Sequence, residues 1–105
     1  MGRDSIRLSY QALQLLSAFL DARSAELTGA DLIRRTALMS GTVYPILLRF
    51  EELGLLRSRW EDQEPQHLKR PRRRLYTLTA KGASVARKAL ARLSPPWVLK
   101  PALGS

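Results

Sequence analysis

The chain has 105 residues, of which 45% are hydrophobic, with one histidine, no cysteine and a net charge of +9. Its length suits one globular domain, its composition excludes disulfides and thiolate sites, and no apolar run approaches the roughly 18 residues of a membrane span. The charge is uneven: residues 1–64 sum to −1, whereas residues 65–105 hold ten bases and no acid, so we expect the second half to contact a polyanion.

The first predicted element is a helix over residues 6–22. Its apolar residues surround more of the helix than the stripe of about 100° that a surface helix needs. We therefore expect it to contact both its own core and a second subunit, although a single wide core contact is the alternative. The residues of this helix assigned to the subunit contact are Leu8, Ala12, Leu15 and Phe19.

A shorter helix is predicted over residues 29–37. Thr28 followed by Asp31 is typical of a capping box, in which two side chains satisfy free amides at the start of a helix. The residues expected on its inner face are Ala30, Ile33 and Ala37. Arg35 is expected on the outer face, where it either contacts a DNA backbone or remains solvated.

The next helix, over residues 40–54, is expected to have Ser40 as its cap and to stop at Gly54. Its buried series follows the helical period and consists of Val43, Ile46, Leu47, Phe50 and Leu53. The opposite face carries Gly41, Tyr44, Pro45, Leu48, Arg49 and Glu52, with Thr42 at its border. Because a tight turn joins the two helices, the pair predicts a helix-turn-helix.

The outer face of this helix suits duplex DNA. Its small first residues allow a close approach to a groove, and the hydroxyl groups of Ser40 and Thr42 suit phosphate oxygens. Tyr44 offers a phenol to phosphate, and Arg49 can reach a phosphate or a guanine edge. The predicted contact set on this helix is Ser40, Gly41, Thr42, Tyr44 and Arg49. An ordinary solvated face is the alternative.

A basic hairpin follows, with strands predicted over residues 55–60 and 73–79. Its polar tip gathers bases whose mutual repulsion is relieved when they meet phosphates and release counterions. Arg74 shares a strand face with Tyr76, so the DNA contacts are assigned to the other four bases, Lys69, Arg70, Arg72 and Arg73. The acids of the outgoing limb are expected to point away from DNA; they are Glu61, Asp62 and Glu64.

A last helix is predicted over residues 80–93, with Thr79 as its cap. Its expected inner face consists of Ala83, Ala86, Ala89, Leu90 and Leu93. One domain is therefore expected over residues 1–93. Residues 94–105 form a tail in which Trp97 is expected to be a local hydrophobic anchor, with packing across a dimer or lining of a ligand cavity as the alternatives.

Two strings in the chain resemble the PadR family of bacterial transcription regulators. They are Gly-Thr-Val-Tyr-Pro-Ile-Leu at residues 41–47 and Arg-Arg-Arg-Leu-Tyr-Thr-Leu-Thr-Ala-Lys-Gly at residues 72–82, with Trp60 between them. The resemblance implies an α+β, mostly α, winged helix-turn-helix with Thr42, Tyr44 and the wing bases at DNA. Where the family has Gly-Tyr at the start of the first motif helix, this chain has Gly29-Ala30.

The resemblance also implies a homodimer that is usually a repressor. The short subfamily dimerises through the first and last helices, which adds Ala86, Leu90 and Leu93 to the subunit contact. Some of its members bind aromatic compounds at that interface, and the effector of this chain, if it has one, is unknown.

Together these features predict a cytoplasmic, dimeric, sequence-specific DNA-binding transcription regulator of the repressor type. Its two recognition helices would lie about 34 Å apart on an inverted-repeat operator. The alternatives are a basic RNA- or ribosome-associated winged-helix module and a winged helix that binds only protein. The sequence offers no nucleophile–base pair, glycine-rich phosphate loop or paired carboxylates, so we expect no enzyme activity, cofactor or metal.

Overall fold

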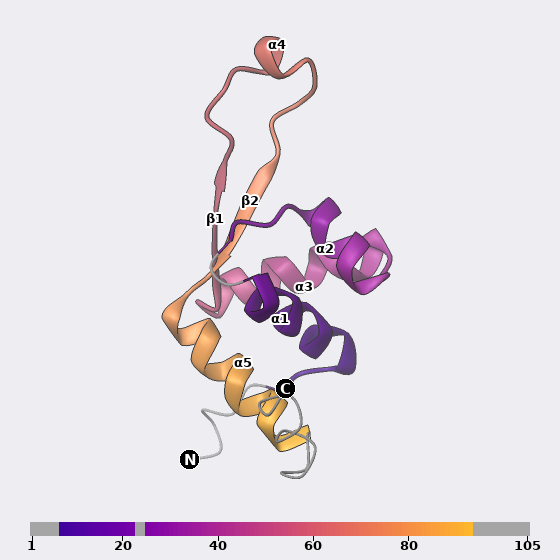
Figure 1. Ribbon diagram of the computed structural model, residues 1–105, viewed down its shortest axis with the longest axis vertical. Helices are drawn as coiled ribbons and strands as arrows, with labels where there is room; N and C mark the ends of the chain where they lie inside the picture. Colours follow the sequence, from indigo (N-terminus) through magenta and orange to yellow (C-terminus); the bar gives the residue numbers. More distant parts are fainter. Residues whose placement is uncertain (1–6, 23–24, 94–105) are drawn as a thin grey trace, which may run out of the picture.

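The computed structural model describes residues 7–22 and 25–93, and it forms a winged helix-turn-helix. The elements in chain order are α1 (Tyr10–Ala22), α2 (Gly29–Thr36), α3 (Ser40–Glu52), β1 (Leu56–Trp60), α4 (Pro65–Leu68), β2 (Arg74–Leu78) and α5 (Ala80–Leu93). The hairpin of β1 and β2 projects from the helical body with α4 at its tip, and α5 extends toward the opposite end (Figure 1). This architecture confirms the predicted fold class. Over the described ranges, no helix is both long and apolar enough to cross a bilayer.

The first helix lies at the centre of the core, and this position corrects the predicted subunit contact. α1 packs against α2, α3, β2 and α5 of its own chain. Ala12, Leu15 and Phe19 are therefore almost completely buried and cannot contact a second subunit, while Leu8 is half-buried against the same core. The apolar surface of α1 is wide because several elements of the same chain surround the helix. This arrangement agrees with the alternative prediction, in which α1 makes a single wide contact with its own core.

The start of α1 also differs from the prediction. The backbone N–H of Ala12 donates to the Ser9 hydroxyl at 3.1 Å, and that of Leu13 donates to the Ser9 carbonyl at 3.0 Å. Ser9 thus caps the helix, which begins at Tyr10 rather than at residue 6.

The capping box at the start of α2 is confirmed. The Asp31 amide donates to the Thr28 hydroxyl at 3.0 Å, and the Thr28 amide donates to the Asp31 carboxylate at 2.9 Å. The predicted inner face was wrong, because Ala30 and Ala37 are exposed and the buried residues are Gly29 and Leu32, with Ile33 half-buried. Two turns contain too few apolar residues to fix the rotation of a helix, so packing against α1 and α3 decides it.

The second helix of the helix-turn-helix, α3, buries the predicted side: Val43, Leu47 and Phe50 are buried, and Ile46 and Leu53 are half-buried against them. Gly54 ends the helix with a left-handed φ of 78°, as predicted. The predicted cap was wrong by one position. Met39 is the N-cap residue and makes no side-chain hydrogen bond, and Ser40 is the first helical residue.

The hairpin strands pair antiparallel, with Leu56 opposite Leu78 and Trp60 opposite Arg74. On the other edge of β2, Leu27 and Tyr76 exchange backbone hydrogen bonds of 2.8 and 3.0 Å. This bridge ties the segment before α2 to the wing. The short helix α4, in the loop between the strands, was not predicted.

Thr79 caps α5 as predicted, because its hydroxyl accepts from the Gly82 amide at 2.9 Å. Gly82 and Ala86 are the buried residues, whereas Leu93 is 59% exposed and so does not point inward as predicted. A Cβ at Gly82 would collide with the Leu55 carbonyl, so glycine is required where α5 crosses the start of the hairpin. The tail and Trp97 lie outside the described residues.

Candidate nucleic-acid interface

The outer face of α3 is open to solvent along its whole length. The side chains there are exposed except Thr42, which is half-buried at the border; they are Ser40, Gly41, Tyr44, Pro45, Leu48, Arg49 and Glu52. A Cβ at Gly41 would meet nothing within 4 Å, so a partner can approach the first turn closely. α3 therefore presents a small, mostly uncharged leading edge, with one arginine further along the same face.

Tyr44 connects the two helices of the helix-turn-helix. Its ring lies directly against the backbone of Gly29, where a Cβ would collide with the phenol. The side chain is nevertheless 46% exposed, so its remaining surface is available to a partner. Gly29 is thus needed for close approach of α2 to α3, and this contact fixes where the Tyr44 hydroxyl lies.

An open cleft of about 380 Å³ separates the helix-turn-helix from the wing. Its walls come from the start of α2, from α3 and from both limbs of the hairpin. The aromatic and basic side chains that line it include Tyr44, Trp60, Arg72, Arg73 and Arg74. Tyr44 belongs both to the outer face of α3 and to this cleft, so the two surfaces are continuous.

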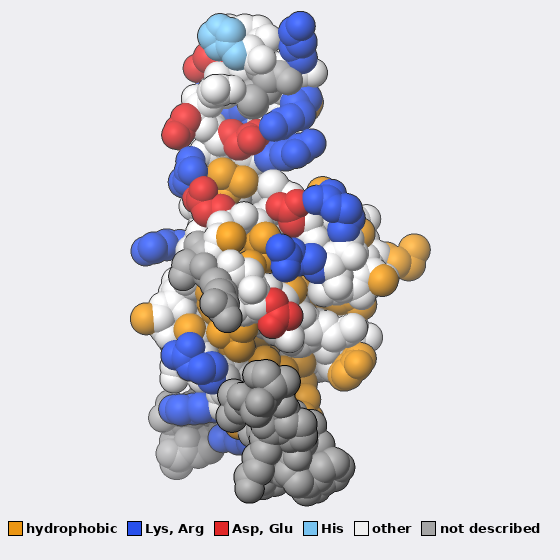
Figure 2. Space-filling view, viewed as in Figure 1, with side chains coloured by type: hydrophobic (Ala, Val, Ile, Leu, Met, Phe, Trp, Pro, Cys, Tyr) orange, Lys and Arg blue, Asp and Glu red, His pale blue; other side chains and the backbone are white. Residues whose placement is uncertain are grey.

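The predicted wing bases divide into paired and unpaired groups. Arg70 donates to both carboxylate oxygens of Glu61, at 2.7 and 3.1 Å, and Arg72 lies 2.8 Å from Glu64. Lys69 and Arg73 are exposed, and neither has a side-chain ion pair within residues 7–22 and 25–93. Figure 2 shows acids and bases together on the projecting hairpin, with the bases near its tip gathered mostly along one edge.

Glu61 and Glu64, two of the acids expected to point away from DNA, lie against bases of the wing. The hairpin sets the two limbs side by side, so each of these carboxylates meets an arginine of the returning limb. The Arg70 guanidinium, and then the Arg73 backbone N–H at 2.8 Å, lower the pKa of Glu61 to about 2. Glu61 therefore stays ionised at neutral pH. Its hydrogen bonds to Arg70 and to the Arg73 amide join the two limbs at the base of the wing tip.

The comparisons with known proteins agree with this geometry. The sequence model of the transcriptional regulator PadR-like family matches residues 25–88, which is more than half of the chain. The chain belongs to the PadR-like family of transcriptional regulators. No curated protein matches it.

Solved PadR structures share the fold. A PadR family regulator from Eggerthella lenta is 26% identical, with a TM-score of 0.64 over 89% of this chain and 77% of that one. One from Clostridium difficile is 19% identical, with a TM-score of 0.68 over 91% and 96%. Bacillus subtilis PadR in complex with operator DNA is 20% identical, with a TM-score of 0.67 over 90% of this chain and 60% of that one. The last two likenesses establish the fold.

A second groove of this PadR-like chain, of about 480 Å³, lies on the other side of the helical body. It runs between α1 and α5, and the exposed apolar residues along it include Tyr10 and Leu93. Arg35 lines this groove and not the wing cleft, so the structure separates it from the other predicted DNA-contact residues. Ala86 is fully buried in the core, while Leu90 is half-buried at the groove wall.

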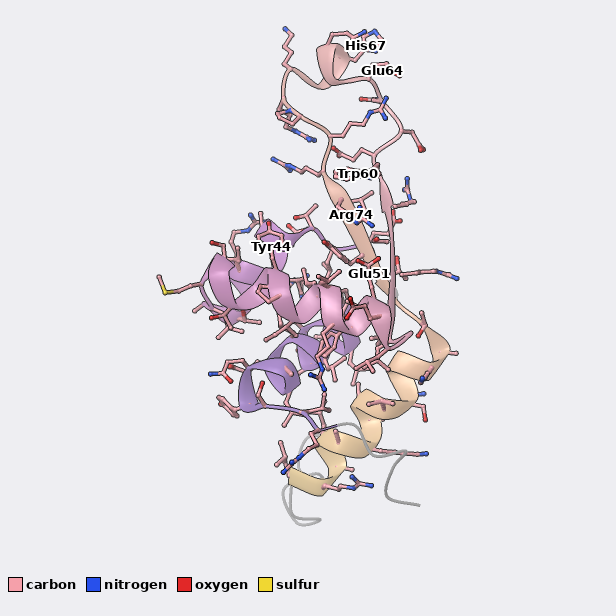
Figure 3. The ribbon with its side chains drawn as sticks, turned by 180° about the vertical axis from the view of Figure 1, so that it is seen from behind. Tyr44, Glu51, Trp60, Glu64, His67 and Arg74 are labelled. Atoms are coloured by element: carbon pink, nitrogen blue, oxygen red, sulfur yellow. The ribbon has the colours of Figure 1, made fainter. Side chains whose placement is uncertain are left out.

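Sequence reasoning missed a side-chain network that joins the wing to α3. Arg74 donates to the Ser58 hydroxyl at 2.8 Å and lies 3.7 Å from Glu51, and the Ser58 hydroxyl also donates to Glu51. On its other side, the Arg74 guanidinium lies 5.1 Å from the centroid of the Trp60 ring. Figure 3 shows Glu51, Arg74 and Trp60 following one another from α3 up the hairpin. Strand alternation could have placed Ser58, Trp60 and Arg74 on one face, but not Glu51.

Proposed function

We propose that this PadR-like regulator is a cytoplasmic homodimer that binds duplex DNA sequence-specifically at an inverted-repeat operator and represses transcription. The observation that carries the proposal is the continuity between the open face of α3 and the cationic cleft, with Tyr44 belonging to both. An α-helix fits the major groove, and a basic hairpin beside it reaches the neighbouring backbone. The family membership supports the regulatory role, and the Bacillus subtilis PadR complex with operator DNA supports the choice of partner.

The contacts divide by chemistry. Tyr44 and Arg49 reach base edges or phosphates from the exposed face of α3, and Ser40, Gly41 and Thr42 allow close approach at its start. Arg73 and Lys69 are exposed and have no ion pair among the described residues, so they can bind phosphates without breaking an existing contact. Arg70 and Arg72 would have to share their guanidinium groups with Glu61 and Glu64, so we assign them a smaller role.

The proposed dimer uses the groove between α1 and α5 in place of the buried residues first assigned to it. Its exposed apolar side chains are Tyr10 and Leu93, and Leu90 lies at the wall. Exposed large apolar groups that cluster on one surface are typical of protein contacts. A twofold pairing there would present two recognition helices to half-sites about 34 Å apart.

Selection of bound sequences from random duplexes tests the function. We expect an inverted repeat whose half-sites are one helical turn apart, with binding that weakens steeply as salt rises. A promoter that contains the selected sequence should then be silenced when the protein is present. Recovery of unrelated sequences, or of a single unrepeated half-site, would contradict the specific dimeric function.

The main rival function is that of a basic RNA-binding module. The half-exposed aromatic side chains of Tyr44 and Trp60 favour it, because unpaired RNA bases stack on such rings. Competition of the selected duplex against structured RNA distinguishes the two. We expect RNA to displace the duplex only at a large excess; equal competition would favour the rival.

A further inference from the structure

Trp60 is a large aromatic side chain held at the surface. It is 53% exposed, at the end of β1, and it lines the cleft that Tyr44 enters from the opposite wall. Burying a tryptophan ring is strongly favourable, so a half-exposed ring in the same cleft as the unpaired Arg73 is a candidate contact surface.

Arg74 holds the Trp60 ring in this position. Its guanidinium lies 5.1 Å from the ring centroid, which is a cation–π geometry. The same group donates to Ser58 of β1 at 2.8 Å and approaches Glu51, near the end of α3, at 3.7 Å. Arg74 is therefore occupied on two sides, and it links the orientation of the indole to the end of α3.

The cleft then offers two kinds of surface side by side. Trp60 supplies an apolar ring, and Arg73 supplies a cation without an ion pair among the described side chains. The backbone of a DNA strand alternates in the same way, with deoxyribose rings between phosphates, and contacts to this backbone position a protein on the duplex.

We propose that Trp60 packs against the deoxyribose of the strand that runs between the recognition helix and the wing, and that Arg74 is the positioning residue that orients the Trp60 ring. The contact rests on the proposed DNA-binding function and adds a residue outside the set predicted from the sequence. Arg74, although it belongs to the basic run, releases no counterion on binding because its guanidinium stays with Glu51, Ser58 and Trp60.

Hydroxyl-radical footprinting on the selected duplex tests the contact, because the radical reports the exposure of each deoxyribose. We expect the wild-type protein to protect a few nucleotides between the major-groove site and the wing site. Trp60→Ala should expose those nucleotides alone and weaken binding about tenfold, as loss of an aromatic anchor does. Trp60→Phe should keep most of the protection.

Arg74→Gln tests the positioning role. It should expose the same nucleotides as Trp60→Ala and leave the salt dependence of binding unchanged, whereas loss of a true phosphate contact lowers the salt slope by about 1. Arg57→Gln is the matched control, because it also removes an arginine from the hairpin. Arg57 is exposed on β1 next to Ser58, and strand alternation places its side chain on the sheet face opposite to that of Trp60 and Arg74. It should leave the protection of these nucleotides intact.

The outcomes separate the contact from the function on which it rests. A wild-type footprint that Trp60→Ala leaves unchanged overturns the deoxyribose contact alone. A fall of the salt slope in Arg74→Gln, equal to that of Arg73→Gln, overturns the positioning role. A wild-type protein that protects no duplex overturns the DNA-binding function together with the contact. Melting curves of each variant, with Trp60→Phe as the mildest change, show whether an altered footprint reflects unfolding.

Discussion

The helix-turn-helix and the wing expose polar surface in different ways. The outer face of α3 keeps Ser40, Tyr44 and Arg49 exposed, and within the described part of the chain their side chains make no hydrogen bond or ion pair. In the wing, by contrast, Arg70, Arg72 and Arg74 each meet a carboxylate or an aromatic ring of the other limb. In the helix-turn-helix, close packing of α2 on α3 leaves the outer face of α3 open. In the wing, ion pairs between the two limbs of the hairpin occupy several of the arginines. Side chains that are adjacent in the basic run therefore have different roles.

The largest expected effect breaks the packed region. Gly82→Ala should lower the free energy of unfolding by about 3 kcal/mol, because the new Cβ meets the Leu55 carbonyl and overpacking of this kind forces the backbone to move. Urea denaturation measures the loss. Gly41→Ala is the matched control. Its Cβ meets nothing within 4 Å, so the free energy of unfolding should not fall. DNA affinity should fall, because the added methyl group hinders close approach to the first turn of α3. Equal stability of the two variants would refute the close packing of α5 on the hairpin.

The next effect separates unpaired from paired wing bases. Arg73→Gln should weaken binding to all duplexes about tenfold and lower the salt slope by about 1, since it removes a free phosphate contact. Arg72→Gln should do less, because its guanidinium is shared with Glu64 at 2.8 Å. Titrations at several salt concentrations give both quantities. Equal losses would mean that the ion pairs of the wing do not persist in solution.

Acid should loosen the base of the wing, where Glu61 accepts from Arg70 and from the Arg73 amide. The pKa of Glu61 is about 2 in the folded protein against an ordinary 4.5, so its contribution to stability is present above pH 4.5 and is lost as the pH falls toward 2. The carboxyl resonance of Glu61, followed by NMR, should titrate near pH 2. In Arg70→Gln the pKa should rise toward 4.5, because the first cause of the shift is gone. An unchanged value would assign the shift to the Arg73 amide.

The smallest effect compares two strained residues, one from each region. Ala37 and Lys69 have left-handed φ values of 62° and 58°, a conformation that costs a non-glycine residue about 1 kcal/mol. Ala37→Gly should therefore raise stability slightly without changing DNA binding. Lys69→Gly should relieve the same strain yet weaken DNA binding, since it also removes a free cation. Thermal melts and duplex titrations of both variants measure the contrast.

Local signals in the sequence were sufficient for much of the fold. The capping box at Thr28 and Asp31, the buried series of α3 and the stop at Gly54 depend on residues within a few positions of one another. The exposed face of α3 was predicted for the same reason, because it is the complement of a buried stripe with a clear period. Strand alternation predicted the hairpin, and the family strings added its arrangement as a wing beside the helices.

Contacts between distant segments were decided only by the tertiary structure. An apolar stripe does not say which element covers it, so Ala12, Leu15 and Phe19 looked available for a subunit contact until α2, α3 and α5 were found around them. A run of arginines does not say which carboxylate lies across the hairpin, so the pairing of Arg70 with Glu61 and of Arg74 with Glu51 required the register and the docking of the wing on α3. Sequence determines local conformation through short-range interactions, whereas the partner of each exposed charge and apolar face depends on how the whole chain packs.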